Sequence, residues 1–215
     1  MTVTQIREHF QWLVDDDTID EDRELALMNV AYDEINIERR WVYLLSSDES
    51  LNIAAGDTTY AVPTDFAFTD KITLFNDVRT YVEFKPVPFR KRLEYKNVSG
   101  YYYVDVKNGM IVFLCADDMT TYAGWSLIHD YAYQPEQFTD NGDEPVFNRA
   151  FHVLIAYQMA KQYFYNDQGE KNRAWNNEFD IEFRSLKLKM IQWDAMLDYG
   201  TNDTLNPVGA FDSVE

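Results

Sequence analysis

Residues 60–66, Tyr60-Ala61-Val62-Pro63-Thr64-Asp65-Phe66, open a strand-rich middle segment with an extended run that contains a proline. Because proline has no backbone N–H for a sheet ladder, the strand is expected to end at Pro63. The segment closes in an acidic loop, Phe138-Thr139-Asp140-Asn141-Gly142-Asp143-Glu144-Pro145-Val146-Phe147. Apolar residues at helical spacing lie on both sides of this strand-rich segment. This order predicts an α+β protein in which N- and C-terminal helices form a bundle with an inserted antiparallel β-sheet.

The same pattern divides the chain into four parts. We expect N-terminal helices over 1–48, an antiparallel β region over 49–138, a C-terminal helical hairpin over 139–199 and an irregular tail over 200–215. The tail has little periodicity and contains glycine and proline, so it is expected to be irregular in the free subunit.

Before the middle segment, apolar residues recur at helical spacing. Ile6, Phe10, Leu13 and Val14 predict a helix over 4–14. A second helix is expected from Asp20, as its N-cap, to Leu45. Residues 46–50 are expected to form a loop.

Within the middle segment, turn residues separate short runs of strand-forming residues. Gly56-Asp57 predicts a hairpin between residues 51–53 and 58–62. Further strands are expected at 71–75, 80–84 and 125–133.

A second hairpin is predicted at Asn108-Gly109, because both residues tolerate the positive φ of a type I′ turn. A two-residue loop would pair Lys107 with Met110, Val106 with Ile111, Val104 with Phe113 and Tyr102 with Cys115. The residues then expected on one apolar face are Val104, Val106, Ile111, Phe113 and Cys115. Cys115 is therefore interpreted as a core residue and not as a nucleophile.

After the acidic loop, two helices are expected, over 145–165 and 171–198. The buried stripe of the first is predicted to hold Phe147, Phe151, Leu154, Ile155 and Met159. The stripe of the second holds Trp175, Phe179, Phe183, Leu186, Met190, Trp193 and Leu197. The short turn between them favours antiparallel neighbours.

Composition restricts the function. The chain has 215 residues, is 46% hydrophobic and carries a net charge of −18. It can bury a core, and its acidity disfavours general nucleic-acid binding, which needs clustered lysine and arginine. No apolar run is long enough for a membrane span, and no secretory signal is expected. The single cysteine excludes an internal disulfide and fits a reducing cytoplasm.

The sequence offers no catalytic constellation. His9, His129 and His152 lie in separate predicted elements, and His129 and Asp130 should face opposite sides of a strand. No motif predicts a metal site or a cofactor site. The acidic residues of 15–17 and 140–144 are interpreted as solvated, helix-capping loops. No catalytic, metal-binding or cofactor-binding residue is therefore expected, and the protein is not expected to be an enzyme.

One basic cluster stands out against the acidic background, formed by Lys85, Arg90, Lys91, Arg92 and Lys96. It could be a surface loop that balances local acids. It could also contact an acidic neighbouring subunit or passing DNA. We treat Lys85, Arg90, Lys91 and Arg92 as candidate contacts to a neighbouring subunit.

The order of these motifs resembles the head-to-tail connector proteins (adaptor or head-completion proteins) of tailed bacteriophages. The resemblance rests on Arg39-Arg40-Trp41-Val42-Tyr43-Leu44-Leu45, the 60–66 stretch, Tyr131-Ala132-Tyr133-Gln134-Pro135 and Pro145-Val146-Phe147. It covers roughly residues 5–200.

The resemblance implies a non-enzymatic virion protein of the head–tail neck, assembled in the bacterial host cytoplasm. It implies a ring, commonly of twelve copies, below the portal protein, with a lumen that passes double-stranded DNA without specific binding. It implies tail or neck proteins as further partners. By analogy, Leu205, Pro207, Val208, Phe211 and Val214 are candidate portal or subunit contacts. The alternatives are another neck or tail-completion protein, a small hydrolase using the loop at 140–144, and a nucleic-acid binder using Lys85–Lys96.

Overall fold

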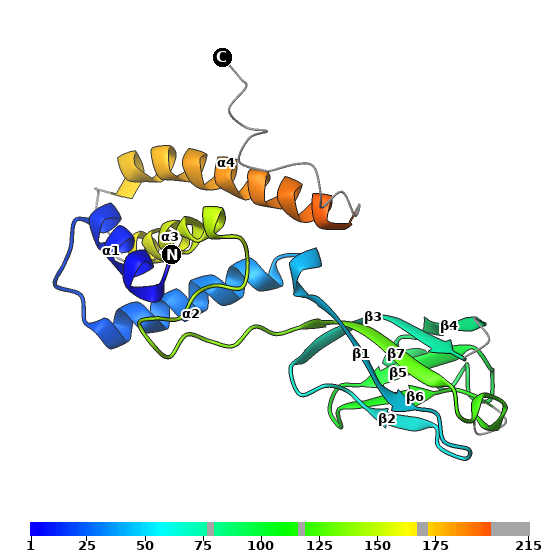
Figure 1. Cartoon of the computed structure of the whole chain (residues 1–215). Helices are drawn as coiled ribbons and strands as arrows, with labels where there is room; N and C mark the ends of the chain where they lie inside the picture. The colour runs from blue at the N-terminus through cyan, green and yellow to red at the C-terminus, as the bar shows by residue number, and fades with distance from the viewer. Residues whose placement is uncertain (77–79, 116–118, 167–171, 199–215) are drawn as a thin grey trace. The chain divides into compact units, whose positions relative to one another are not determined.

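The computed structural model describes residues 1–76, 80–115, 119–166 and 172–198 (Figure 1). The protein is α+β, as expected. The chain divides into two compact units: a helical unit formed by Met1–Tyr43 with Pro135–Glu215, and a strand unit formed by Leu44–Gln134.

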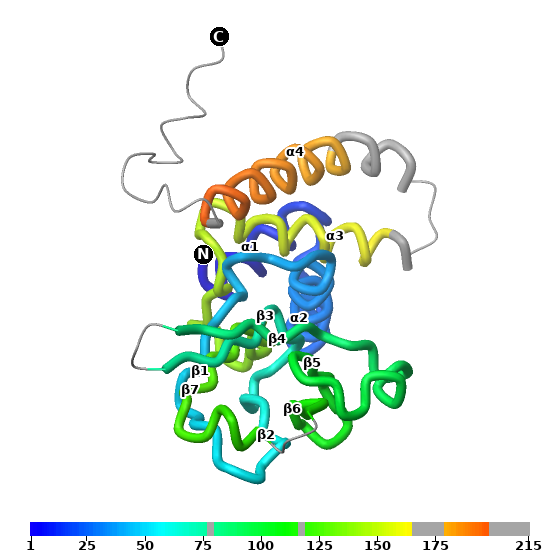
Figure 2. Tube along the Cα trace, turned by 90° about the vertical axis from the view of Figure 1, so that its right-hand side faces the viewer, coloured from blue at the N-terminus to red at the C-terminus, as the bar shows by residue number. Residues whose placement is uncertain are grey.

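The helical unit is organised around one helix. Its described α-helices are α1 (Val3–Val14), α2 (Glu21–Ile37), α3 (Val153–Asn166) and α4 (Asn172–Asp198). Helix α3 contacts each of the other three (Figures 1 and 2). Side chains cap the first two helices, as Thr2 accepts a hydrogen bond from the Gln5 N–H and Asp20 accepts from the N–H groups of Asp22 and Arg23. The predictions of the 4–14 helix and of the Asp20 cap are confirmed.

Helix α2 ends at Ile37, so the prediction of a helix reaching Leu45 was wrong. The indole Nε1 of Trp41 donates to the Ile35 carbonyl oxygen at 2.7 Å. The Asp194 carboxylate then accepts from the N–H groups of Val42 (2.7 Å) and Tyr43 (3.1 Å). Because these N–H groups bind a side chain far along the sequence, they do not continue the i→i−4 ladder of a helix.

Helix α3 also differs from its prediction at its start. A 3-10 turn, η4 (Arg149–Phe151), precedes it and is capped by the Asn148 side chain, so the α-helix begins at Val153 and not at 145. The predicted stripe is nevertheless buried in full: Phe147, Phe151, Leu154, Ile155 and Met159.

Helices α3 and α4 pack as antiparallel neighbours, as predicted. The Tyr157 ring lies against Phe179, and the Phe151 ring, earlier in the chain, lies against Trp193, later in the chain. The Tyr157 hydroxyl donates to Glu182 at 2.5 Å. Phe183 and Met190 of the α4 stripe are buried. Trp175 belongs to a part of α4 whose side chains lie outside the described residues.

The strand unit forms one curled, barrel-like sheet (Figure 1). Its described strands are β1 (Leu45–Asn52), β2 (Thr59–Ala61), β3 (Phe66–Phe75), β4 (Tyr81–Pro86), β5 (Tyr101–Asp105), β6 (Met110–Phe113) and β7 (Ser126–Tyr133). Their order is β1-β7-β3-β4-β5-β6-β2. The pairing of β4 with β5 is parallel, so the expectation of a wholly antiparallel sheet was wrong at this point.

The hairpin at Asn108-Gly109 has a longer loop than predicted. Val104 pairs with Ile111, and Tyr102 pairs with Phe113. The predicted register was therefore wrong. The longer loop is stabilised by Asp105, whose carboxylate accepts a hydrogen bond from the Asn108 side-chain amide at 2.8 Å. Val106 consequently lies in the loop and is 73% exposed, contrary to its prediction as a core residue.

Two further strand predictions were wrong. Residues 46–50, expected to be a loop, belong to β1, which pairs with β7. The hairpin expected at Gly56-Asp57 does not form, because β2 pairs with β6. By contrast, the strands expected at 71–75, 80–84 and 125–133 correspond to parts of β3 and β4 and to β7.

A cluster of buried apolar residues lies inside the described part of the strand unit. Ile72, Leu74, Phe84, Ile111 and Leu127 are among its buried members. Cys115 belongs to the same cluster, which confirms its interpretation as a core residue.

Candidate interaction surface

A groove opens in the strand unit where β3 and β4 separate. Strand β4 pairs with β3 through Tyr81–Phe84, and its last residues, Lys85 and Pro86, pair with β5 instead. The first half of β3 is therefore hydrogen-bonded to β7 but has no strand on its other side within the described chain. The separation leaves an open space between β3 and β5.

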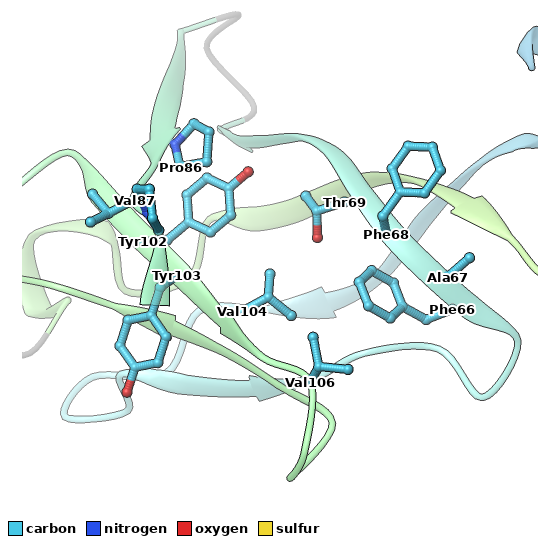
Figure 3. A pocket seen from close by; sticks show the side chains of 11 residues that line it. Phe66, Ala67, Phe68, Thr69, Pro86, Val87, Tyr102, Tyr103, Val104 and Val106 are labelled. Atoms are coloured by element: carbon cyan, nitrogen blue, oxygen red, sulfur yellow. The ribbon is translucent and has the colours of Figure 1, made fainter. Parts of the chain in front are cut away.

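The groove has a volume of about 420 Å³ and mainly apolar walls (Figure 3). One wall is Phe66–Thr69 of β3, and the other is Tyr102–Val104 of β5 with Val106 beyond it. Pro86, Val87 and Pro88 line the end where β4 leaves. Phe68 is 39% exposed, so the groove presents aromatic surface to solvent.

The predicted basic cluster lies next to this groove. Lys85 is exposed at the end of β4, directly before the lining residue Pro86, and the 3-10 turn η2 (Phe89–Lys91) directly follows the lining residue Pro88. The Phe89 ring meets the Tyr103 ring edge to face, with 5.6 Å between centroids. Lys85 and Arg90–Arg92 therefore lie directly beside, in the chain, the residues Pro86–Pro88 that line one end of the groove, and we call this basic segment the rim.

Arg92 differs from the other basic residues of the cluster. Its guanidinium stacks over the Phe89 ring at 3.9 Å from the centroid and donates to the Phe89 carbonyl oxygen at 2.9 Å. It is therefore fixed in place and only half-buried. Phe89 and Leu93 add exposed apolar surface beside it, 47% and 74% exposed.

Four basic side chains of the 85–96 segment are exposed and carry charge that no described carboxylate pairs with. Lys85, Arg90, Lys91 and Lys96 are exposed, and none forms an ion pair with a carboxylate of the described residues. The interpretation that they balance local acids has no such contact to support it. The cluster is an exposed cationic segment with the exposed apolar side chains of Phe89 and Leu93 beside it.

The tail residues chosen as candidate contacts, Leu205, Pro207, Val208, Phe211 and Val214, lie outside the described residues. Sequence reasoning did not identify the groove itself. Its signal was the alternation of aromatic and small residues in Phe66-Ala67-Phe68-Thr69, which marks a strand beginning before residue 71.

The acidic loop at 140–144 has a structural role in the described chain. The Asp143 carboxylate accepts from the N–H groups of Thr139 (2.8 Å) and Asp140 (2.9 Å). These bonds, with the Asp140 N–H as the largest cause, lower the pKa of Asp143. The loop carbonyl oxygens of Asn141 and Asp143 accept from the first N–H groups of α1. The loop therefore caps α1, and it is exposed.

His129 is buried and binds a neutral partner. Its Nε2 lies 3.0 Å from the Thr69 hydroxyl, and burial lowers its pKa. Asp130, its neighbour in β7, lies on the opposite face, as expected from strand alternation. Across the described ranges, no group of three or more histidine, cysteine or acidic side chains is arranged to hold a metal.

None of the helices in the described parts of the chain is both long enough and apolar enough to cross a membrane.

The described chain thus presents an exposed apolar groove with basic residues beside it, and the acidic residue Asp143 is occupied in capping α1. The family comparison identifies the kind of protein. The model of the SU10 adaptor protein family matches residues 1–204, and the chain belongs to this family of phage head–tail adaptors. It is therefore a structural component of a phage virion. A search of curated proteins found no match.

Proposed function

We propose that this adaptor docks as a ring, of twelve copies as in connectors it resembles, beneath the portal protein. The ring extends the DNA channel and offers the platform to which tail or neck proteins attach. The helical unit builds the ring, and assembly takes place in the host cytoplasm. The match to the adaptor family over residues 1–204 carries this proposal.

The charge of the chain supports a channel role. A net charge of −18 gives a surface that repels a polyanion, whereas clustered lysine and arginine would retain it. Double-stranded DNA can then pass the ring without specific binding. In this proposal the basic rim beside the groove faces protein and not DNA.

Electron microscopy of the purified protein mixed with purified portal rings tests the proposal. We expect an added ring of density on one face of the portal and co-elution of the two proteins in gel filtration. A protein that binds purified tail proteins but never the portal would instead be a neck or tail-completion protein.

A charge-reversal variant tests whether the basic rim takes part in assembly. Arg90→Glu with Lys91→Glu should reduce ring formation on the portal, because it reverses the exposed charge next to the groove. The matched control is Arg23→Glu with Lys161→Glu, which makes the same charge change at exposed positions of the helical unit. Because the helical unit is proposed to build the ring, equal loss of assembly in both variants would leave the rim without a specific role, since net charge or a ring contact of the helical unit would explain it as well.

A further inference from the structure

The β5 edge of the groove carries main-chain groups that can bind an added segment. In an antiparallel pair, successive residues direct their peptide groups alternately toward and away from the partner strand. The Val87 N–H donates to the Tyr102 carbonyl oxygen at 2.8 Å, so the peptide groups of Tyr102 face away from β6. By the same alternation, the N–H and carbonyl of Val104 face the groove. An extended peptide lying there can bond to them.

The walls determine what side chains such a peptide carries. The Phe66 ring points across the groove toward Val104 and Val106, and Phe68 and Tyr103 belong to the same two walls (Figure 3). Aromatic and branched side chains on both walls favour an occupant with apolar residues at regular intervals.

The charge of the rim indicates the charge of the peptide that would occupy the groove. Residues 85–96 contain five basic residues, Lys85, Arg90, Lys91, Arg92 and Lys96, against one acid, Glu94, which leaves a net charge of +4 on this segment. Complementarity therefore favours an acidic occupant.

One segment of the chain outside the described residues has both properties. Residues 199–215 contain Leu205, Val208, Phe211 and Val214, each three positions after the last. They also contain Asp203, Asp212 and Glu215 and have no lysine or arginine. In a β-strand, residues three apart would point to opposite faces, so this spacing fits a polyproline II peptide, with three residues per turn, and not an added β-strand.

We propose that residues 203–214 of one copy occupy the groove of a second copy, with their acids toward the basic rim. The choice of a second copy rests on the proposed ring: a segment of one subunit bound to a different surface of the next is a heterologous contact, and such contacts close rings. The groove and the segment are then the two halves of one subunit interface.

Disulfide trapping between full-length variants tests this. Val106→Cys and Phe211→Cys chains, carrying different tags, are mixed under mild oxidation, both at high concentration and on portal rings. We expect a cross-linked dimer carrying both tags. Val106 is 73% exposed, so its replacement should not disturb folding. Phe68→Cys, on the opposite wall, is a second probe. Leu188→Cys, 61% exposed on α4, is the matched control and should yield several-fold less cross-link with Phe211→Cys.

The Arg90→Glu, Lys91→Glu background should lower the yield several-fold at low salt. Cross-linking only within a chain that carries both cysteines would overturn the second-copy assignment. No cross-link from either wall above the Leu188→Cys level would overturn the groove assignment. If the protein binds the portal without the cross-link, this inference fails and the proposed function stands; absence of portal binding overturns the proposed function by itself.

Discussion

Arg7 forms salt bridges with two glutamates, one buried and one exposed. Its Nε lies 3.1 Å from a carboxylate oxygen of Glu24, whose side chain is 0% exposed, and its Nη1 lies 3.3 Å from one of Glu21, 79% exposed. Burial raises the pKa of Glu24, and Gln11 donates to it at 2.8 Å. The buried carboxylate depends on its partners, and so does the nearly buried guanidinium.

We expect Glu24→Ala to lower the free energy of unfolding by about 3–5 kcal/mol, because it leaves Arg7 without its buried partner. Glu21→Ala, which removes the exposed partner of the same arginine, should cost about 0–1 kcal/mol. Urea denaturation followed by helical circular dichroism measures both. Equal losses would show that burial does not distinguish the two pairs.

His129 should make the stability of the strand unit depend on pH. Burial lowers its pKa below the ordinary value of 6.5, with Asp48 and Asp130 opposing that shift. The unfolded chain therefore binds a proton more readily, so stability should fall as pH drops below 6.5 toward the folded-state pKa. His129→Gln, which has no such titration, should lose less stability between pH 7.5 and 5.5. Hydrogen–deuterium exchange of β3 and β7, corrected for the intrinsic rate, compares the two proteins.

The titration of Asp48 lies outside this pH range. Hydrogen bonds from Ser50 lower its pKa from 3.8. Its stabilisation is therefore lost at more acidic pH. If the His129→Gln variant had the same pH profile as the wild type between pH 7.5 and 5.5, another group would have to be responsible.

Among the elements, the β5–β6 hairpin depends on one glycine. Gly109 has φ +63°, and an added Cβ would meet only the Val62 side chain, at an ordinary 3.8 Å. Backbone strain should therefore dominate the cost of Gly109→Ala, about 1–2 kcal/mol. Gly142→Ala, at a glycine with no positive φ and open space around it, should be close to neutral. Urea denaturation of both variants measures the difference.

How well each element could be predicted depended on where its partners lie. Helix α1 and the buried stripe of α3 follow from local spacing, because each buries a continuous apolar face. Of the predicted α4 stripe, Phe183 and Met190 are buried. The end of α2 could not be predicted, since Asp194, on another helix, binds the N–H groups of Val42 and Tyr43. Strand β1 was missed because its sequence is polar and its main chain pairs only with the distant β7.

The candidate site, too, could be predicted only in part from the sequence. The basic residues of the rim are a local sequence feature and were identified. The groove was not, because it arises where β4 leaves β3 for a parallel pairing with β5, and neither strand's sequence encodes that choice locally. Val106 shows the same limit, since its exposure follows from the Asp105–Asn108 hydrogen bonds in the loop.

At the scale of the whole molecule, net charge should govern the encounter with DNA. With −18 overall, the protein is expected to leave double-stranded DNA unshifted in an electrophoretic mobility assay at about 150 mM salt, where non-specific binders depend on many phosphate contacts. A retarded band that weakens as salt rises, and disappears in Arg90→Glu with Lys91→Glu, would instead assign the rim to nucleic acid.

The chain enters the strand unit in β1 and leaves it in β7, and these strands lie side by side, with Leu45 opposite Ala132 (Figure 2). The two junctions with the helical unit are therefore separated by about one strand spacing, roughly 5 Å. Residues 44–134 form a contiguous cassette with adjacent ends. A chimaera that replaces this cassette would therefore have to match the chain of the helical unit at two neighbouring joins.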